Sequence, residues 1–98
     1  MARLIWSRRA RDNLRQVRRY IANDSPRAGK RVADRITQAT RRLEELPMSG
    51  RVVPEDPYGE LREIIVSPYR VIYEIKTDVI EIKSVRHGAQ NLSDLREP

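Results

Sequence analysis

The spacing of hydrophobic residues changes once along the chain, near residue 50, and this change limits the folds that the sequence can adopt. Before that point apolar residues recur every three or four positions, which is the period of a helix with one buried face. From Leu61 onward they alternate, which is the period of a half-buried strand. A helical half followed by a strand-forming half predicts an α+β fold.

Two helices are expected in the first half, joined by a short turn. Ser7 and Ser25-Pro26 are favourable helix starts, Asn23-Asp24 ends the first helix, and Pro47 ends the second. The apolar stripes are Ala10, Leu14, Val17 and Ile21 in the first helix, and Ala28, Val32, Ile36, Ala39, Leu43 and Leu46 in the second. Because the turn is short, the helices should pack as an antiparallel hairpin over about residues 8–46.

Strands are expected between about residues 60 and 86, where tight turns predict antiparallel pairing. They are Leu61–Val66, Tyr69–Lys76 and Val79–Val85, and Arg3–Trp6 should add a short edge strand. A polar tail follows over residues 88–98, in which only Leu92 and Leu95 can dock. The prediction is a single α+β domain over residues 1–98, with an N-terminal antiparallel helix hairpin packed on one face of a small antiparallel β-sheet.

Alternation along the strands predicts which side chains face the helices and which form the open face of the sheet. Val71, Tyr73 and Ile75 should face the helices, together with Ile65 and with Ile80 or Ile82. The open face should carry Arg62, Ile64, Val66, Arg70, Ile72, Glu74, Glu81, Lys83, Val85 and His87. A shift of one residue in strand register would reverse these assignments.

Composition excludes several classes of protein. The chain has no cysteine and one histidine, so disulfides, cysteine zinc sites and multi-histidine metal sites are excluded. There is no glycine-rich phosphate loop and no other cofactor or metal motif, so we expect no cofactor, no metal and no small-molecule substrate. No apolar run approaches the length of a membrane span and no signal peptide is visible, so the expected compartment is the cytoplasm, with no membrane partner.

The net charge of +6 is concentrated in the helical half. Residues 1–53 hold 14 basic and 5 acidic residues, a net +9, whereas residues 54–98 hold 6 and 9, a net −3. Such asymmetry indicates a nucleic acid or an acidic protein as the partner. The candidate target-binding residues are Arg11, Arg15, Arg18 and Arg19 on the first helix, although an ordinary solvated face explains the same arginines.

Two groups on the predicted open face can carry function. Arg62, Arg70, Lys83 and His87 form a candidate catalytic set, because cations can hold a phosphate while a histidine moves a proton in metal-independent RNA cleavage. Ile64, Val66, Ile72 and Val85 form an apolar patch that can bind a partner strand or helix. Scattered solvated charges, and a tail that covers the patch through Leu92 and Leu95, are the alternatives.

Three short motifs follow one another in the second half. They are Leu-Pro-x-x-Gly-Arg at residues 46–51, Tyr-Arg-Val-Ile-Tyr at 69–73 and Val-Arg-His-Gly-Ala at 85–89. With these motifs the chain resembles, over about residues 3–92, the ParE/RelE superfamily, the toxins of bacterial type II toxin–antitoxin modules. The resemblance implies two helices against a small antiparallel sheet, a cognate acidic antitoxin that binds the apolar patch, and a role in plasmid or chromosomal stabilisation.

The superfamily has two kinds of target. RelE-like members cut mRNA on the ribosome, and ParE-like members inhibit DNA gyrase without chemistry of their own. Arg62 and Arg70 fall where RelE-like toxins carry functional basic residues, and His87 lies near where some carry an acid or base. However, no tyrosine or phenylalanine follows His87, and Ala89-Gln90 replaces the usual Ala-Arg. We therefore expect ParE-type inhibition, with an mRNA endoribonuclease and a degenerate non-toxic binding module as the alternatives.

Overall fold

The structure is a computed structural model and describes residues 2–89, 94 and 95. Its elements are β1 (Arg3–Trp6), α1 (Arg8–Ala22), α2 (Pro26–Arg41), β2 (Arg51–Val52), β3 (Leu61–Val66), β4 (Tyr69–Ile75) and β5 (Val79–His87). Two 3₁₀ turns, η1 (Arg42–Glu44) and η2 (Pro47–Ser49), connect α2 to β2. The predicted α+β fold, a helix pair followed by a small sheet, is confirmed.

The helix starts are as predicted. The Ser7 and Ser25 hydroxyl oxygens accept hydrogen bonds from the backbone N–H groups of Ala10 and Ala28, at 3.0 and 3.2 Å. The end of the second helix differs from the prediction, because α2 stops at Arg41 and tightens into η1. Leu46, expected on the buried stripe, is 61% exposed as a result.

The sheet is mixed, with strand order β1-β5-β4-β3-β2. Strands β2 to β5 pair antiparallel, as predicted, whereas β1 lies parallel to β5 at the edge. The predicted edge strand at Arg3–Trp6 is therefore confirmed, but the sheet is not wholly antiparallel. The two-residue β2 was not predicted and pairs only with Arg62 and Glu63.

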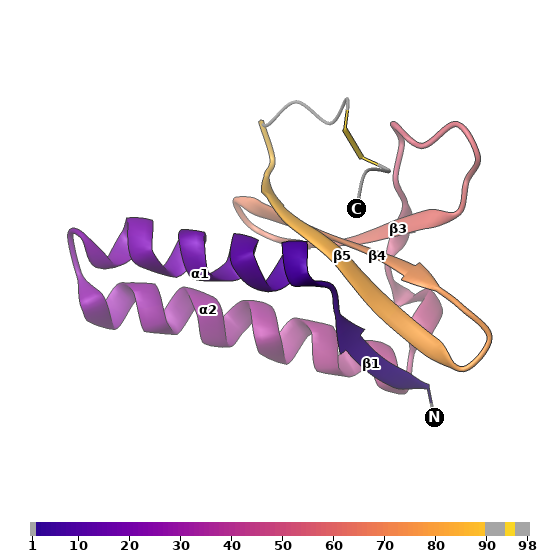
Figure 1. Cartoon of the computed structure of the whole chain (residues 1–98), viewed down its shortest axis with the longest axis horizontal. Helices are drawn as coiled ribbons and strands as arrows, with labels where there is room; N and C mark the ends of the chain where they lie inside the picture. The colour runs from indigo at the N-terminus through magenta and orange to yellow at the C-terminus, as the bar shows by residue number, and fades with distance from the viewer. Residues whose placement is uncertain (1, 90–93, 96–98) are drawn as a thin grey trace.

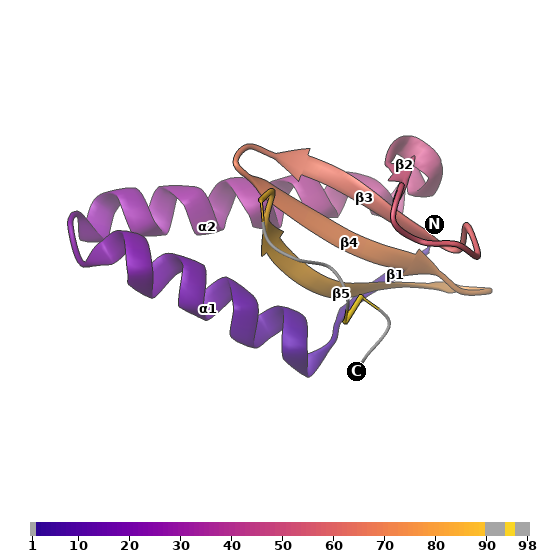
Figure 2. The ribbon, with the colours of Figure 1, turned by 90° about the horizontal axis from the view of Figure 1, so that it is seen from above.

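The helices cover one face of the sheet and extend past it at the α1–α2 turn (Figures 1 and 2). Side chains from both helices, from η1 and from the strands form the core between the helices and the sheet. Its most buried members are Ala10, Ile36, Leu43, Val71, Tyr73, Ile80 and Ile82. The predictions that Val71, Tyr73, Ile80 and Ile82 face the helices are confirmed, whereas Ile75 is exposed.

The predicted face assignment of β3 is wrong by one residue. Ile64 lies opposite Val71 and Val66 lies opposite Tyr69, so both belong to the helix side of the sheet. Arg62, opposite Tyr73, shares that side. Glu63 and Ile65 consequently point to the other face, which we call the outer face, together with Arg70 and Ile72 of β4.

A bulge in β5 explains why Val85 faces the opposite side of the sheet from the predicted one. Ile72 lies opposite Ser84 and Tyr73 lies opposite Ile82, so Lys83 is an extra residue in the ladder. The bulge allows both Ile82 and Val85 to face the helix-side core although they are three residues apart. The prediction that Val85 lies on the open face is wrong for this reason.

Candidate functional site

The four residues predicted to form a catalytic set do not come together. Arg62 and His87 lie on the helix side of the sheet by register, opposite Tyr73 and Tyr69 respectively. Arg70 belongs to the outer face, and Lys83 occupies the bulge of β5. The prediction of one cluster is therefore wrong, because the register of β3 and the bulge in β5 place its members on different sides.

Each of the three cations in that set is held by groups of the chain itself. Arg62 Nη1 donates to the carbonyl oxygen of Gly50 at 2.7 Å. Lys83 Nζ lies 3.3 Å from a carboxylate oxygen of Glu81 and 3.7 Å from one of Glu74. The ion pairs of Lys83 are partly exposed and contribute little to stability, but they reduce the positive charge that a ligand would meet there.

Arg70 is the most constrained of these residues. Its guanidinium donates to both oxygens of Glu55, at 2.7 and 2.8 Å, and to Glu63 at 2.6 Å. The hydrogen bonds to Glu55 and Glu63 raise the pKa of Arg70 above its ordinary value. The hydrogen bonds that Glu55 accepts from Arg70 lower the pKa of Glu55 to about 2. Arg70 is thus a neutralised structural cation rather than an open phosphate-binding group.

The predicted exposed apolar patch is absent from the described surface. Val66 and Val85 are buried in the helix-side core, and Ile64 packs against it. Ile72 lies on the outer face as predicted, but it is buried in a second cluster with Val53, Leu61 and Leu95. The alternative in which the tail covers this face holds for Leu95, while Leu92 lies outside the described residues.

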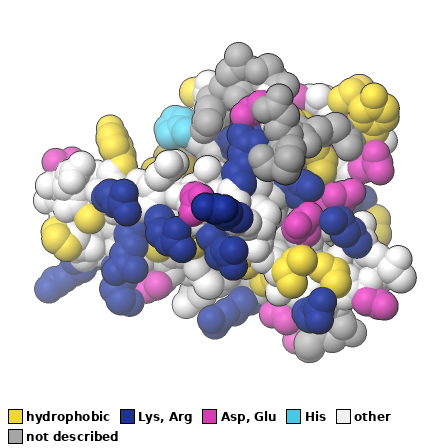
Figure 3. All heavy atoms as spheres, viewed as in Figure 1, with side chains coloured by type: hydrophobic (Ala, Val, Ile, Leu, Met, Phe, Trp, Pro, Cys, Tyr) yellow, Lys and Arg dark blue, Asp and Glu magenta, His cyan; other side chains and the backbone are white. Residues whose placement is uncertain are grey.

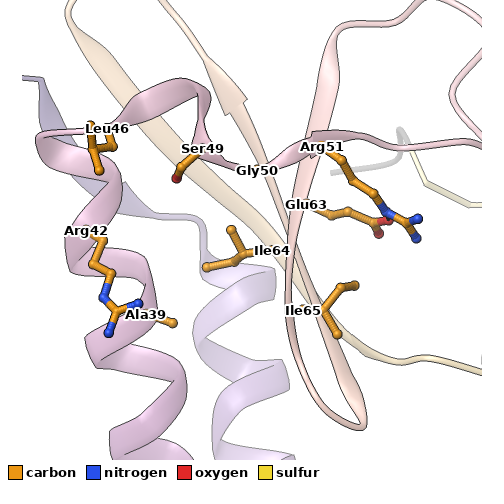
Figure 4. A pocket seen from close by; sticks show the side chains of 9 residues that line it. All are labelled: Ala39, Arg42, Leu46, Ser49, Gly50, Arg51, Glu63, Ile64 and Ile65. Carbon is orange, nitrogen blue, oxygen red and sulfur yellow. Dashed lines mark hydrogen bonds and ion pairs between the residues drawn. The ribbon is translucent and has the colours of Figure 1, made fainter.

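A groove between α2 and the edge of β3 is the clearest binding surface near the predicted sites. One section of about 470 Å³ is lined by Arg42, Leu46, Ile64 and Ile65, among others, and Figure 4 shows Ile64 pointing from β3 toward α2. A second section of about 310 Å³ continues it along α2 past Arg35 to Val66 and Ser67. The sequence offered no signal for this groove, because it depends on the early end of α2 and on the register of β3.

The outer edge of β3 is open beside this groove. Strand β2 pairs only with Arg62 and Glu63, so residues 64–66 have no strand neighbour on that side within the described part of the chain. Ile65 is 54% exposed there. An unpaired strand edge with an exposed apolar side chain can accept an added strand from a partner.

Tyr73 fixes the end of the groove. Its hydroxyl accepts a hydrogen bond from the Gly50 N–H at 3.0 Å and donates one to the Pro47 carbonyl at 2.7 Å. Burial raises the pKa of Tyr73, so the phenol keeps its proton and its donor role. The Leu-Pro-x-x-Gly-Arg segment is held on the sheet by these two bonds.

The predicted basic face of α1 is present. Arg11, Arg15, Arg18 and Arg19 are all exposed, and Figure 3 shows basic side chains gathered over the face that α1 presents. Arg15 pairs with Asp12 at 2.8 Å, and the other three make no ion pair with the described residues. This face can therefore attract a phosphate backbone or an acidic protein surface.

Residues 2–89, 94 and 95 contain neither a cluster of metal-ligating side chains nor a helix suited to cross a membrane. No three histidine or carboxylate side chains lie close enough together to hold a metal ion. Neither helix there has the length and apolar character that a membrane span needs.

Comparisons with known proteins agree on one family. The family model described as "ParE toxin of type II toxin-antitoxin system, parDE" matches residues 4–92. A curated relative, Toxin RelE2 of Caulobacter vibrioides, is 35% identical over 91 residues, which cover 92% of this chain and 99% of the relative. A solved structure titled "Chromosomal ParDE TA system from P. aeruginosa" has the same fold, with a TM-score of 0.75 at 21% identity, over 89% of this chain and 96% of the other.

The family match covers nearly the whole chain, and the fold of two helices against a small sheet agrees with it. Membership implies an antitoxin as the partner. The chain belongs to the ParE toxin family of type II toxin–antitoxin systems.

Proposed function

We propose that this toxin inhibits DNA gyrase by binding it, and that the toxin itself catalyses no reaction. The observation that carries the proposal is the pairing of Arg70 with both Glu55 and Glu63. A nuclease needs an uncompensated cation at the scissile phosphate and an acid or base within hydrogen-bond reach of the reacting atoms. Here Arg70 is neutralised on the outer face, and His87 lies on the helix side.

The basic face of α1 is the proposed gyrase-binding surface. Its arginines are exposed, whereas Ala10, Leu14, Val17 and Ile21 of the same helix pack on the core. The face requires no chemistry from the toxin, only a complementary negative surface on gyrase or on the DNA that gyrase holds. Gyrase and DNA lie in the cytoplasm, so we propose that compartment for the toxin, and plasmid or chromosomal stabilisation for the module.

The α2–β3 groove is the proposed antitoxin site. It combines an open strand edge, the exposed apolar residues Leu46 and Ile65, and the cations Arg35 and Arg42. A segment that is acidic and apolar in alternation would pair with the edge of β3 and neutralise the arginines. Ile64 and Val66, predicted to bind the antitoxin, belong to the wall of this groove, whereas Ile72 and Val85 do not.

Gyrase supercoiling of relaxed plasmid tests the proposal. The purified toxin should inhibit supercoiling and accumulate cleaved plasmid, and its antitoxin should reverse both effects. Charge reversal of the arginines at 11, 15, 18 and 19 to glutamate should abolish inhibition. A control on the other helix, Arg27→Glu with Arg31→Glu, changes exposed arginines of α2 and should retain inhibition. His87→Ala should also retain it.

Cleavage of mRNA on the ribosome is the second candidate, because the curated relative carries the name Toxin RelE2. Under that alternative Arg62, Arg70 and Lys83 would have to exchange their present partners for a phosphate, and His87 would act as the acid or base. New RNA 5′ ends on induction, with gyrase untouched at high toxin excess, would favour the nuclease. Unimpeded growth with abundant soluble toxin would instead indicate a degenerate binding module.

A further inference from the structure

The edge of the sheet formed by β1 has backbone groups without a strand partner. The N–H groups of Arg3 and Ser7 donate to backbone carbonyl oxygens on the β5 side, each at 3.0 Å. Because successive residues of a strand direct their N–H and C=O groups to opposite edges, those of Leu4 and Trp6 point away from β5. In the part of the chain that the structure describes, β5 is the only strand beside β1. Two donors and two acceptors are therefore open on this edge.

We propose that two copies of this chain associate through β1, each strand adding in antiparallel orientation to the sheet of the other copy. A two-fold axis at Ile5 is the register that uses all four open groups, because it places Leu4 of one copy opposite Trp6 of the second copy. The two sheets then become one continuous sheet, and no further copy can add at this edge. The proposal goes beyond gyrase inhibition, since it concerns contact of the toxin with itself.

The side chains along the edge suit this register. Leu4 and Trp6 pack against the helix-side core, so by alternation Arg3 and Ile5 belong to the outer face. Ile5 is 37% exposed there. The axis places Ile5 opposite Ile5 of the second copy, at a position without mutual hydrogen bonds, where side chains approach most closely. On the helix side each Leu4 meets a Trp6, so the cross-strand pairs at the centre of the contact are all apolar.

Two charges of opposite sign stand at the two ends of the edge. Glu44 of η1 lies beside β1 at its start, where its carbonyl oxygen accepts the Ala2 N–H at 3.3 Å. Arg8 follows β1 at its other end, is exposed and begins α1. Neither Arg8 nor Glu44 forms an ion pair with any residue that the structure describes. Antiparallel pairing brings each Arg8 opposite Ala2 of the second copy, and therefore beside Glu44.

This charge arrangement selects a second copy as the occupant. A strand of an acidic protein would satisfy the open backbone groups and attract Arg8, but it would meet Glu44 with a like charge. A second copy presents a cation to Glu44 and a carboxylate to Arg8, and it does so at both ends of the contact. The α2–β3 groove lies at the opposite edge of the sheet, so the dimer leaves the proposed antitoxin site open in both copies.

Disulfide cross-linking tests the register, because the chain has no cysteine of its own. Ile5→Cys should form a covalent dimer under mild oxidation, since directly opposed residues without mutual hydrogen bonds have Cα atoms about 4.5 Å apart, within reach of a disulfide. Arg3→Cys should not, because it lies opposite Ser7 of the second copy. Ile65→Cys is the matched control, because Ile65 is an exposed isoleucine on the other edge of the sheet.

Sedimentation at several protein concentrations tests the charge pairs without cysteine. The parent should form a dimer as its concentration rises. Arg8→Glu and Glu44→Arg should each weaken dimerisation about tenfold or more, because each variant replaces both attractive contacts by repulsive ones. The double variant should recover most of this loss, since it restores both pairs with reversed sign. A circular dichroism spectrum like that of the parent shows that each variant is folded.

Three outcomes would overturn the proposal. The first is a parent that stays monomeric at every concentration, and the second is cross-linking of Ile5→Cys that is no faster than that of Ile65→Cys. The third is a double charge variant that dimerises no better than the weaker of its two single variants. Gyrase is absent from both measurements, so failure here leaves gyrase inhibition untouched, and failure to inhibit gyrase leaves this contact open to the same tests.

Discussion

Arg70 and Arg86 lie directly opposite each other on β4 and β5, and the side chains of both are at least nine-tenths buried. Like charges in that position repel, so each must be compensated. Glu55 and Glu63 compensate Arg70, while Asp94 bridges Arg86, at 2.6 Å, and Arg9 of α1. The outer face of the sheet is thus held by a layer of ion pairs beside the small apolar cluster around Ile72.

Replacing Glu63 should destabilise the fold strongly. Its buried carboxylate binds Arg70 at 2.6 Å and Arg51 at 2.5 Å, and Glu63→Gln leaves the buried guanidinium of Arg70 short of one negative charge. We expect the free energy of unfolding in urea to fall by about 3–5 kcal/mol. Glu45→Gln, which alters an exposed carboxylate, is the control and should change it by less than about 0.5 kcal/mol. A loss below about 1 kcal/mol for Glu63→Gln would mean that Glu55 alone compensates Arg70.

Stability should also decline in acid. Hydrogen bonds from Arg70 lower the pKa of Glu55 from 4.5 to about 2, and those from Arg86 and Arg9 lower the pKa of Asp94 from 3.8 to about 2. A carboxylate whose pKa is lower in the folded state stabilises the fold above its unfolded pKa, and this contribution is lost as the pH falls through the folded value.

The free energy of unfolding should therefore decrease between about pH 4.5 and about pH 2. Glu55→Gln should make that decrease shallower, measured by urea titration at several pH values. Because the Glu55 side chain is 44% exposed, its share is small, at most about 1 kcal/mol. An identical pH dependence in Glu55→Gln and in the parent would rule out this contribution from the Arg70–Glu55 pair.

The proposed antitoxin site predicts a selective loss of affinity. Arg35→Glu with Arg42→Glu places two negative charges in the α2–β3 groove and should weaken binding of the antitoxin about tenfold or more in calorimetry. Arg27→Glu with Arg31→Glu makes the same change in net charge on α2, outside the groove, and should have much less effect. Equal losses in both double variants would show that only overall charge matters.

Much of this fold could be predicted from local patterns. The serine caps and the helix period depend on residues close in sequence, and the helix pair followed by a sheet follows from them. The register of β3 could not be predicted, because Leu61 and Ile65 are apolar at one parity and Ile64 and Val66 at the other. Alternation therefore fits either face, and the choice is made by pairing with β4.

The candidate site was harder to predict for a related reason. The basic face of α1 follows from helical spacing alone and is present as predicted. The pairing of Arg70 with Glu55 joins a strand to a loop 15 residues earlier, and the bulge at Lys83 depends on the fit of β5 to β4. Neither leaves a local signal in the sequence. The prediction therefore placed Arg62, Arg70, Lys83 and His87 on one face of the sheet, although they lie on different sides.

Gly29 of α2 lies where α2 packs most closely against α1, the helix that presents the basic face. A methyl group at this position would lie 2.6 Å from the carbonyl oxygen of Arg18 and 3.2 Å from Ala22 Cβ, both in α1. Two effects oppose each other in Gly29→Ala, since alanine favours the helix by about 1 kcal/mol while overpacking costs about 1–3 kcal/mol. The contact at 2.6 Å is with backbone, which cannot rotate away, so we expect a net loss of stability.

Thermal unfolding of Gly29→Ala should therefore show a lower Tm than the parent, and Gln38→Ala, at an exposed position of the same helix, should leave the Tm unchanged or slightly higher. If the helices separate to admit the methyl group, Arg18 and Arg19 move relative to α2, and the variant should inhibit gyrase less well even at a temperature where it is folded. A Tm above that of the parent would mean that helix propensity outweighs the contact and that the α1–α2 spacing can relax at little cost.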